Sequence, residues 1–287
     1  MMAYGTHNQP AGTWSDDSSM VIATMEWLGE MEDHQPDYRL LMDKFNRWIM
    51  DGEYTPYGVV FDSGISTRMA IGEFRKGIEP LECGGASEWD NGNGSLMRIL
   101  PAALWCCEDL TEDVEKCKEF IFQMSSLTHR HLRSKIACLI YSKLIAGLFA
   151  AEEKDKLKIV ENSMAVCKAH FDLLDDKETW DEKKHFARLW DVEAFKNLEE
   201  DEIKSSGYVV HTLEAAMWCF LNTENYKDCV LKAVNLGHDT DTTAAVAGGL
   251  AGLWYGLEDI PADWIDILPK KDWIITLCKN MVENIAK

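Results

Sequence analysis

The sequence predicts an all-α protein that forms a single compact multi-helical domain. Apolar residues recur at the three-to-four-residue spacing of amphipathic helices along most of the chain. Runs with strand-like alternation are scarce, and no internal repeat or long linker divides the 287 residues. Hydrophobic residues make up 46% of the chain, which is enough for a substantial core. We therefore expect one domain over residues 1–287.

The expected helices follow from apolar periodicity and from the turn residues between them. In 207–222, for example, Val209, Leu213 and Phe220 fall on one helical face. The segment 176–206 is charged and weakly periodic, so we expect a loop or a surface excursion there. The predicted helices cover about 16–31, 38–50, 66–76, 95–107, 111–125, 129–151, 155–175, 207–222, 225–236, 240–255 and 271–285.

Composition excludes several classes of protein. The net charge of −20 repels nucleic acid and anionic membranes. The sequence has no apolar run long enough to span a membrane, and its start lacks the features of a signal peptide. The nine cysteines are scattered, with Cys106-Cys107 as the only close pair, which indicates reduced core thiols rather than disulfides or a zinc site. We expect a cytoplasmic protein with no nucleic-acid or membrane partner.

Two acidic runs, far apart in the sequence, each precede a helical pattern. The first contains Ser15, Asp16 and Asp17, and the second is Gly237-His238-Asp239-Thr240-Asp241-Thr242-Thr243. The Ala- and Gly-rich stretch after the second run could pack closely on its neighbours. Ordinary N-caps explain either run alone, because Ser, Thr and Asp are common at helix starts. Hard oxygens so clustered also suit Mg²⁺, Mn²⁺ or Ca²⁺.

The two acidic runs could face each other and form one dinuclear metal centre. Neighbouring aspartates repel unless a cation lies between them. Four carboxylates would balance two divalent ions, and Ser15 and Thr242 would add neutral oxygens. The carboxylates are those of Asp16, Asp17, Asp239 and Asp241.

The run Asp90-Asn91-Gly92-Asn93-Gly94-Ser95-Leu96-Met97-Arg98 is a candidate phosphate site. Its two glycines allow a sharp turn, and a helix beginning at Ser95 would offer free N–H groups to an anion. Arg98 would add a charge in the first turn. A simple loop with a capped helix is the alternative.

Three further polar or aromatic residues stand at expected helix starts. His129 and His131 do not share a helical face, so a zinc pair is not expected, although one of them could hydrogen-bond a ligand. Tyr208 follows Gly207 and either stacks on a base or fills core.

In this order, these motifs resemble the ADP-ribosylglycohydrolase family, whose members include bacterial and animal hydrolases that remove ADP-ribose from acceptors. The resemblance covers roughly residues 5–255. It rests on the two acidic runs, the 90–98 loop, Thr128-His129-Arg130-His131 and Gly207-Tyr208-Val209-Val210. It implies an all-α fold with two Mg²⁺ or Mn²⁺ in a cleft.

The resemblance also implies roles for individual residues. The metal ligands would be Ser15, Asp16, Asp17, Asp239, Asp241 and Thr242. The catalytic residues would be Asp16, Asp17 and Asp90, any of which could accept the proton of the attacking water. The substrate-binding residues would be Gly92, Asn93, Gly94, Ser95, His129 and Tyr208, with Tyr208 stacking on adenine.

The resemblance implies a metal-dependent hydrolase that cleaves the bond between ADP-ribose and an acceptor, with ADP-ribosyl-arginine on protein as the first candidate. ADP-ribose or an ADP-ribosylated protein is the expected partner of a monomer or weak homo-oligomer. The family's usual first helix, with its Gly-Asp-Ala-Leu-Gly-like run, is not present, so we expect ADP-ribose binding with slow or undetectable turnover. An inactive relative that binds ADP-ribose, or a structural crystallin-like protein, is the alternative.

Overall fold

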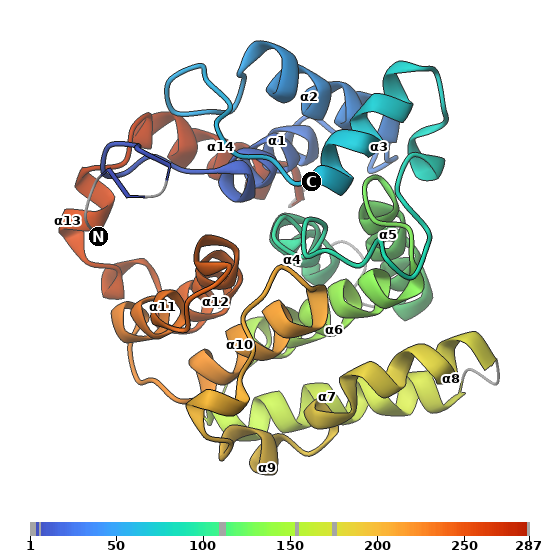
Figure 1. Cartoon of the computed structure of the whole chain (residues 1–287), viewed down its shortest axis with the longest axis vertical. Coiled ribbons are helices and arrows are strands. Elements are labelled where there is room, and N and C mark those ends of the chain that lie inside the picture. Colours follow the sequence, from blue (N-terminus) through green and yellow to red (C-terminus); the bar gives the residue numbers. More distant parts are fainter. Residues whose placement is uncertain (1–3, 6, 109–112, 153–154, 174–176, 286–287) are drawn as a thin grey trace.

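The computed structural model describes residues 4–5, 7–108, 113–152, 155–173 and 177–285. Within these ranges the chain forms fourteen α-helices and four short 3₁₀ helices, and no β-strands, only two isolated β-bridges. The predicted all-α class is therefore confirmed. No described helix combines the length and the apolar character that crossing a membrane requires. Figure 1 shows the helices packed around one another.

The α-helices are α1 (Asp16–Gly29), α2 (Tyr38–Asp51), α3 (Ile65–Arg75), α4 (Leu100–Glu108), α5 (Val114–Ser126), α6 (Leu132–Phe149), α7 (Lys156–Leu173), α8 (Lys177–Lys183), α9 (Val192–Lys196), α10 (Val209–Leu221), α11 (Tyr226–Asn235), α12 (Thr240–Tyr255), α13 (Ala262–Asp266) and α14 (Lys271–Ile285). The 3₁₀ helices are η1 (Pro80–Glu82), η2 (Lys184–Trp190), η3 (Glu200–Glu202) and η4 (Leu257–Asp259).

Most predicted helices are confirmed with small shifts at their ends, but two regions were predicted wrongly. The helix expected from residue 95 begins only at Leu100, because 93–98 form turns. The segment expected as a loop in 176–206 carries α8, η2, α9 and η3, which pack Phe186, Leu189 and Phe195 into the core. The expected start at residue 111 lies outside the described ranges.

Helices α6 and α10 form the centre of the molecule. In α10 every residue except His211 is buried. The one-sided pattern expected for 207–222 is therefore only part of a helix that is enclosed on all sides. In α6, Ile136, Ile140 and Ile145 are inaccessible to solvent. Helices α4, α5, α7 and α12 contact α6, and α11 and α12 contact α10.

Helix α12 packs closely on its neighbours, as its composition predicted. A Cβ at Gly249 would lie 2.4 Å from the Tyr141 hydroxyl of α6. That hydroxyl donates a hydrogen bond to the Val246 carbonyl at 3.1 Å. A side chain at position 249 would therefore push α12 away from α6. Since α12 begins at the second acidic run, this packing fixes where that run lies.

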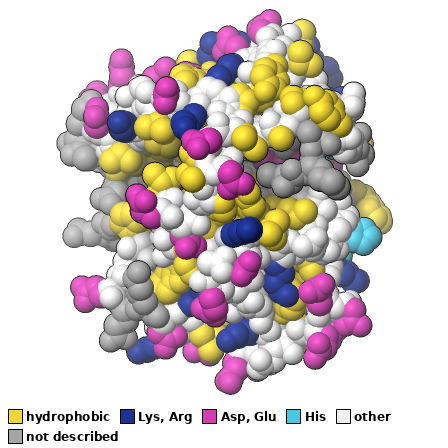
Figure 2. Space-filling model, turned by 90° about the vertical axis from the view of Figure 1, so that its left-hand side faces the viewer, with side chains coloured by type: hydrophobic (Ala, Val, Ile, Leu, Met, Phe, Trp, Pro, Cys, Tyr) yellow, Lys and Arg dark blue, Asp and Glu magenta, His cyan; other side chains and the backbone are white. Residues whose placement is uncertain are grey.

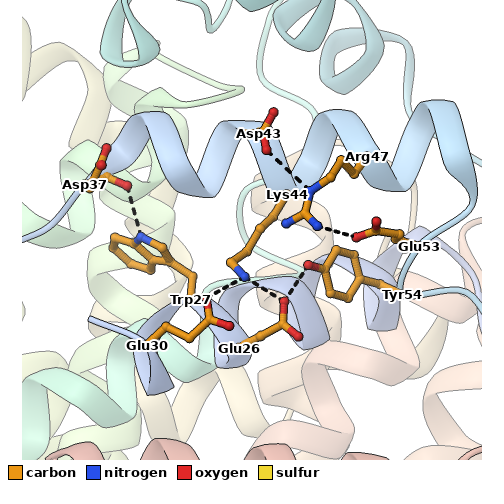
Figure 3. A network of polar contacts seen from close by, with 9 residues as sticks. All are labelled: Glu26, Trp27, Glu30, Asp37, Asp43, Lys44, Arg47, Glu53 and Tyr54. Atoms are coloured by element: carbon orange, nitrogen blue, oxygen red, sulfur yellow. Dashed lines mark hydrogen bonds and ion pairs between the residues drawn. The ribbon is translucent and has the colours of Figure 1, made fainter. Parts of the chain in front are cut away.

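A polar network joins α1 to α2 (Figure 3). The Lys44 side chain is only 3% exposed and its ammonium lies 2.6 Å from Glu26 and 2.7 Å from Glu30. The Tyr54 hydroxyl donates to the same Glu26 carboxylate at 2.6 Å. A buried ammonium needs such partners to offset its lost hydration. The network holds α2 against α1, the helix that begins at the first acidic run.

Candidate active site

The two acidic runs begin helices that meet in space, since α1 contacts α12. Ser15 and Asp239 occupy the N-cap positions of these helices, yet neither side chain makes a capping hydrogen bond. The Ser15 hydroxyl instead donates to Asp17 at 2.7 Å. The Asp239 carboxylate accepts from the Asn93 side-chain amide at 2.8 Å. Capping alone therefore does not account for these side chains.

A third segment, not anticipated from the sequence, brings another carboxylate to the same place. One carboxylate oxygen each from Asp16, Asp62 and Asp241 lie within 4.8 Å of one another. The Gly64 N–H donates to Asp16 at 3.1 Å, which ties α1 to the start of α3. The only sequence signal for Asp62 was its place just before an expected helix, the same position as the other two runs. We call Asp16, Asp17, Asp62, Asp239 and Asp241 the acid cluster.

Burial and mutual repulsion raise the pKa values within the acid cluster. Burial, with the charge of Asp62 next, raises the pKa of Asp16 to about 6. The pKa of Asp17 is raised well above its ordinary value, first by burial and then by the charges of Asp241 and Asp16. Burial also raises the pKa of Asp239. The charged forms of these groups therefore need a compensating cation.

The acid cluster fits divalent metal ions. Asp17 is 3% exposed, and its Oδ1 atom is a buried oxygen without a hydrogen-bond partner among the described residues. Such an oxygen is costly to bury unless something binds it. Carboxylate and hydroxyl oxygens are the donors that Mg²⁺ and Mn²⁺ prefer. Thr242, which is buried and hydrogen-bonded to Asp239, adds a hydroxyl to the set.

A cavity of about 350 Å³ opens beside the acid cluster. It is lined at α3 by Ile65, Ser66 and Thr67, and elsewhere by Met97 and Gly207. The predicted site residues in its wall are Asp16, Gly92, Asn93, Gly94, His129, Asp239, Asp241 and Thr242. The other predicted site residues, Ser15, Asp17, Asp90, Ser95 and Tyr208, are not in its wall.

The glycine-rich loop is held against the start of α10. The Asn93 N–H donates to the Gly207 carbonyl, and the Val209 N–H donates to the Asn91 carbonyl, both at 3.0 Å. The Asn93 side chain bridges Thr212 of α10 and Asp239 of the acid cluster. Asn93 therefore links the loop, α10 and the start of α12.

The end of this loop does not form the predicted phosphate-binding helix start. Ser95 is fully buried, and its hydroxyl accepts from Ser125 at 3.0 Å. Arg98 is also fully buried and points into the core, where it donates to the Met124 carbonyl and lies over the Phe45 ring. Neither side chain reaches the cavity, because the chain turns inward before α4 begins.

His129 and His131 have separate surroundings. The His129 ring lies in the cavity wall with its Nδ1 atom 2.9 Å from the Thr128 hydroxyl. Burial, with the charge of Arg98 next, lowers the pKa of His129 to about 3, so the ring is neutral. His131 instead caps α6 by accepting the Arg133 N–H.

Asp90 and Tyr208 flank the site. Asp90 accepts from the Ser87 N–H and hydroxyl, at 2.9 and 2.6 Å, which holds its pKa below the ordinary value. The Tyr208 ring meets His211 edge-on, with a centroid distance of 4.9 Å, and the Arg133 guanidinium lies 5.9 Å from it. Catalysis by Asp90 and adenine stacking by Tyr208 stay predictions.

Comparisons with known proteins agree with this geometry. The sequence model of a family described as ADP-ribosylglycohydrolase matches residues 1–287. The ADP-ribosylarginine hydrolase Tri1 of Pseudomonas putida is 31% identical over 99% of this chain and 70% of its own length. The ADP-ribosyl-[dinitrogen reductase] glycohydrolase of Rhodospirillum rubrum is 32% identical over 64% of this chain and 53% of its own. A solved structure titled ADP-ribosylglycohydrolase-related protein complex superposes with a TM-score of 0.73 and 26% identity, covering 98% of this chain and 85% of that one.

Proposed function

Because the chain belongs to the ADP-ribosylglycohydrolase family, we propose that it hydrolyses the glycosidic bond between ADP-ribose and arginine side chains of proteins. The observation that carries this proposal is the acid cluster in a cavity that the glycine-rich loop also lines. The choice of arginine is supported by relatives that are named ADP-ribosylarginine hydrolases and align over nearly the whole chain.

The metal ligands we propose are Asp16, Asp17, Asp239, Asp241, Thr242 and Ser15, with Asp62 beside them, and the ions are two Mg²⁺ or Mn²⁺. Bound divalent ions supply the positive charge that lowers the pKa of a water molecule and polarises ribose oxygens. The neighbouring hydrogen bonds from Gly64 to Asp16 and from Asn93 to Asp239 hold these carboxylates in place.

In the reaction, water attacks the anomeric carbon of the ribose and the bond from that carbon to the guanidine nitrogen breaks. The transition state is oxocarbenium-like, as in other glycoside cleavage. We propose Asp16 as the acceptor of the water's proton because its carboxylate lies in the cavity wall, whereas Asp17 is more deeply buried. The leaving guanidine takes up a proton, which balances the step.

The cavity wall around Gly92–Gly94 would receive the diphosphate and ribose. A Cβ at Gly94 would lie 2.8 Å from the His129 ring and 3.0 Å from the Thr67 hydroxyl. Glycine at this position therefore keeps the backbone close to the ring and leaves space for the ligand. Tyr208 lies opposite Gly92 in an isolated β-bridge whose hydrogen bonds are made by its neighbours Gly207 and Val209, and it is the residue we propose to stack on adenine.

The test is to incubate the protein with peptides that carry ADP-ribose on arginine or on serine and to measure released ADP-ribose. We expect release from the arginine peptide with Mg²⁺ or Mn²⁺ and none with EDTA. An Asp241→Asn variant serves as the matched inactive control. Absence of release from the arginine peptide with either metal would overturn the proposal, and release from the serine peptide alone would change the acceptor.

A further inference from the structure

The surroundings of His129 decide which of its ring nitrogens carries the proton. Two buried side chains form a hydrogen-bonded chain that ends at the ring: Arg98 contacts Thr128, and Thr128 contacts His129. The Arg98 guanidinium donates to the Thr128 hydroxyl at 2.9 Å, and that hydroxyl lies 2.9 Å from His129 Nδ1. Thr128 is inaccessible to solvent, so water cannot replace either contact.

The chemistry of the three groups favours one arrangement of protons. A guanidinium can only donate, so the Thr128 oxygen accepts from Arg98 and keeps its own proton to give away. Among the described residues, the remaining polar neighbour of that hydroxyl is His129 Nδ1. If Nδ1 were protonated, the hydroxyl proton of Thr128 would be buried without an acceptor. An unprotonated Nδ1 accepts a hydrogen bond from the Thr128 hydroxyl, so both the donor and the acceptor are paired, and the ring proton is then on Nε2.

The electrostatics exclude the doubly protonated ring and favour an anionic partner. Arg98 is fully buried, with its Nε and Nη1 atoms unpartnered among the described residues, and its lowered pKa of about 10 still leaves it charged near neutral pH. The other charge acting on the ring is Asp90, whose effect on the pKa of His129 is smaller than that of Arg98. A nearby uncompensated guanidinium disfavours imidazolium and attracts negative charge.

The Nε2 edge of the ring faces the glycine-rich loop. A Cβ at either Gly92 or Gly94 would lie 3.4 Å from Nε2. Because both positions are glycine, no side chain there covers this edge, and His129 contributes to the cavity wall. Among the described residues, no hydrogen bond to Nε2 is found, and Nε2 is not one of the fully buried polar atoms that lack a partner, so this atom is open to the cavity and free to donate to a ligand.

We propose that Arg98 and Thr128 hold His129 as the neutral tautomer with its proton on Nε2, so that the ring donates a hydrogen bond to a phosphate oxygen of the bound ligand. Arg98 and Thr128 are positioning residues that act through His129. The tautomer follows from this chain's own contacts, and only the identity of the phosphate ligand, ADP-ribose, rests on the proposed function.

The first experiment reads the tautomer directly by ¹⁵N NMR of the histidine rings, with the His129 signals assigned by their loss in His129→Gln. A protonated and a bare ring nitrogen have distinct ¹⁵N shifts, so the free protein suffices. We expect a neutral ring with a protonated Nε2 from pH 5 to 8. A protonated Nδ1, or a ring that gains a second proton in this range, would overturn the assignment whether or not the protein is a hydrolase.

The second experiment removes the Thr128 hydroxyl, which lies between Arg98 and His129. Thr128→Val keeps the shape of the side chain but not the hydroxyl, and Thr128→Ser keeps the hydroxyl. We expect Thr128→Val to mix the two tautomers and to weaken ADP-ribose binding about tenfold, and Thr128→Ser to restore both. Equal affinities for the wild type and Thr128→Val would show that Thr128 only packs.

The third arm tests the ligand. On addition of ADP-ribose to the wild type with Mg²⁺, the Nε2-bound proton should move downfield, because a hydrogen bond to a charged oxygen is stronger. An unchanged proton at saturation would refute the phosphate contact while leaving the tautomer standing. Absence of any ADP-ribose binding would refute the proposed function instead.

Discussion

At the scale of single residues, the carboxylates of the acid cluster differ in how far their substitution would disturb the protein core. Asp241 is exposed and lies in the cavity wall, whereas Asp17 is buried with an unpartnered oxygen. Removing the charge of an exposed member changes the site without opening the core. Removing that of Asp17 changes the core as well. Variants at Asp241 and Asp62 therefore report on metal binding most cleanly.

We predict that Asp241→Asn and Asp62→Asn each lower the metal bound per chain while leaving the helical content unchanged. The amide keeps the shape but lacks the charge that a hard cation needs. Elemental analysis after dialysis against Mn²⁺ gives the stoichiometry, and circular dichroism gives the fold. Asp263→Asn, an exposed aspartate of α13, is the matched control. Full metal content in both variants would show that the assigned ligands are wrong.

We predict that the pH dependence of stability identifies Asp16. Its pKa is raised from 3.8 to about 6 in the folded protein. Its contribution is therefore fully present below about pH 4 and is lost as pH rises through about 6. In EDTA, the free energy of unfolding of the wild type should fall relative to Asp16→Asn by up to about 3 kcal/mol between pH 4 and 7, at about 1.4 kcal/mol per pKa unit.

Urea unfolding of both proteins across this range measures that difference. Titrating groups outside the acid cluster, His129 among them, are common to both proteins and cancel. With saturating Mg²⁺ the trend should disappear, because bound cations favour the ionised form. Parallel stability curves in EDTA would contradict the raised pKa.

Individual residues of the site could be predicted from the sequence only where local spacing carries the signal. Asp16 and Asp241 stand in short acidic runs, so their chemistry is visible locally. Asp62 stands alone, and only the tertiary packing of α1, α3 and α12 brings it to the others. Ser95 and Arg98 show the opposite case. Their types suit a phosphate site, yet the late start of α4 turns both inward.

At the scale of the elements, the charged network between α1 and α2 fixes how the two helices are oriented against each other. The partners of Lys44 are Glu26 in the last turn of α1 and Glu30 directly after its end, so a single ammonium fixes the rotation of α2 against α1 (Figure 3). Glu26 also accepts from Tyr54, which follows the end of α2. The network thus ties both α2 and the segment that follows it to α1.

We predict that Lys44→Met destabilises the protein by about 1–3 kcal/mol. The ammonium is nearly inaccessible, and its loss leaves two adjacent carboxylates facing each other. The lower part of that range reflects the partial exposure of Glu26 and Glu30. Chemical denaturation measures the change. Lys76→Met, whose ammonium pairs with Glu73 on the surface, should change the stability by no more than about 0.5 kcal/mol. Equal effects at both positions would contradict a special role for Lys44.

The helices could be predicted where apolar residues recur clearly on one face or where turn residues mark the end of the helix. The range 240–255 matches α12, and 271–285 matches α14. The segment 176–206 was missed because α8, η2, α9 and η3 are each seven residues or shorter. Such lengths are too short for helical periodicity to stand out, and their stability comes from packing rather than from local sequence.

At the scale of the whole molecule, charge is the dominant feature. The net charge of −20 is spread over the surface, and the face in Figure 2 shows acidic side chains interspersed with basic and uncharged ones. The acid cluster concentrates part of this charge within the fold. A divalent cation bound at the acid cluster would offset this local repulsion.

We predict that Mg²⁺ or Mn²⁺ raises the melting temperature of the whole protein by several degrees. Metal that binds only the native state adds about 2.7 kcal/mol at 100 times its dissociation constant. Differential scanning fluorimetry in EDTA and in millimolar metal measures the shift, and Asp241→Asn should reduce it. A melting curve unaffected by either metal would count against the site.

The acid cluster joins segments from distant parts of the chain, and this has a consequence for how the protein is made. During synthesis, Asp16 and Asp62 leave the ribosome long before Asp239 and Asp241. In the folded protein α12 contacts both α6 and α1, so the acid cluster is complete only once α12 has docked. We therefore expect a metal ion to bind the folded protein rather than the nascent chain, and to slow the unfolding of the finished protein.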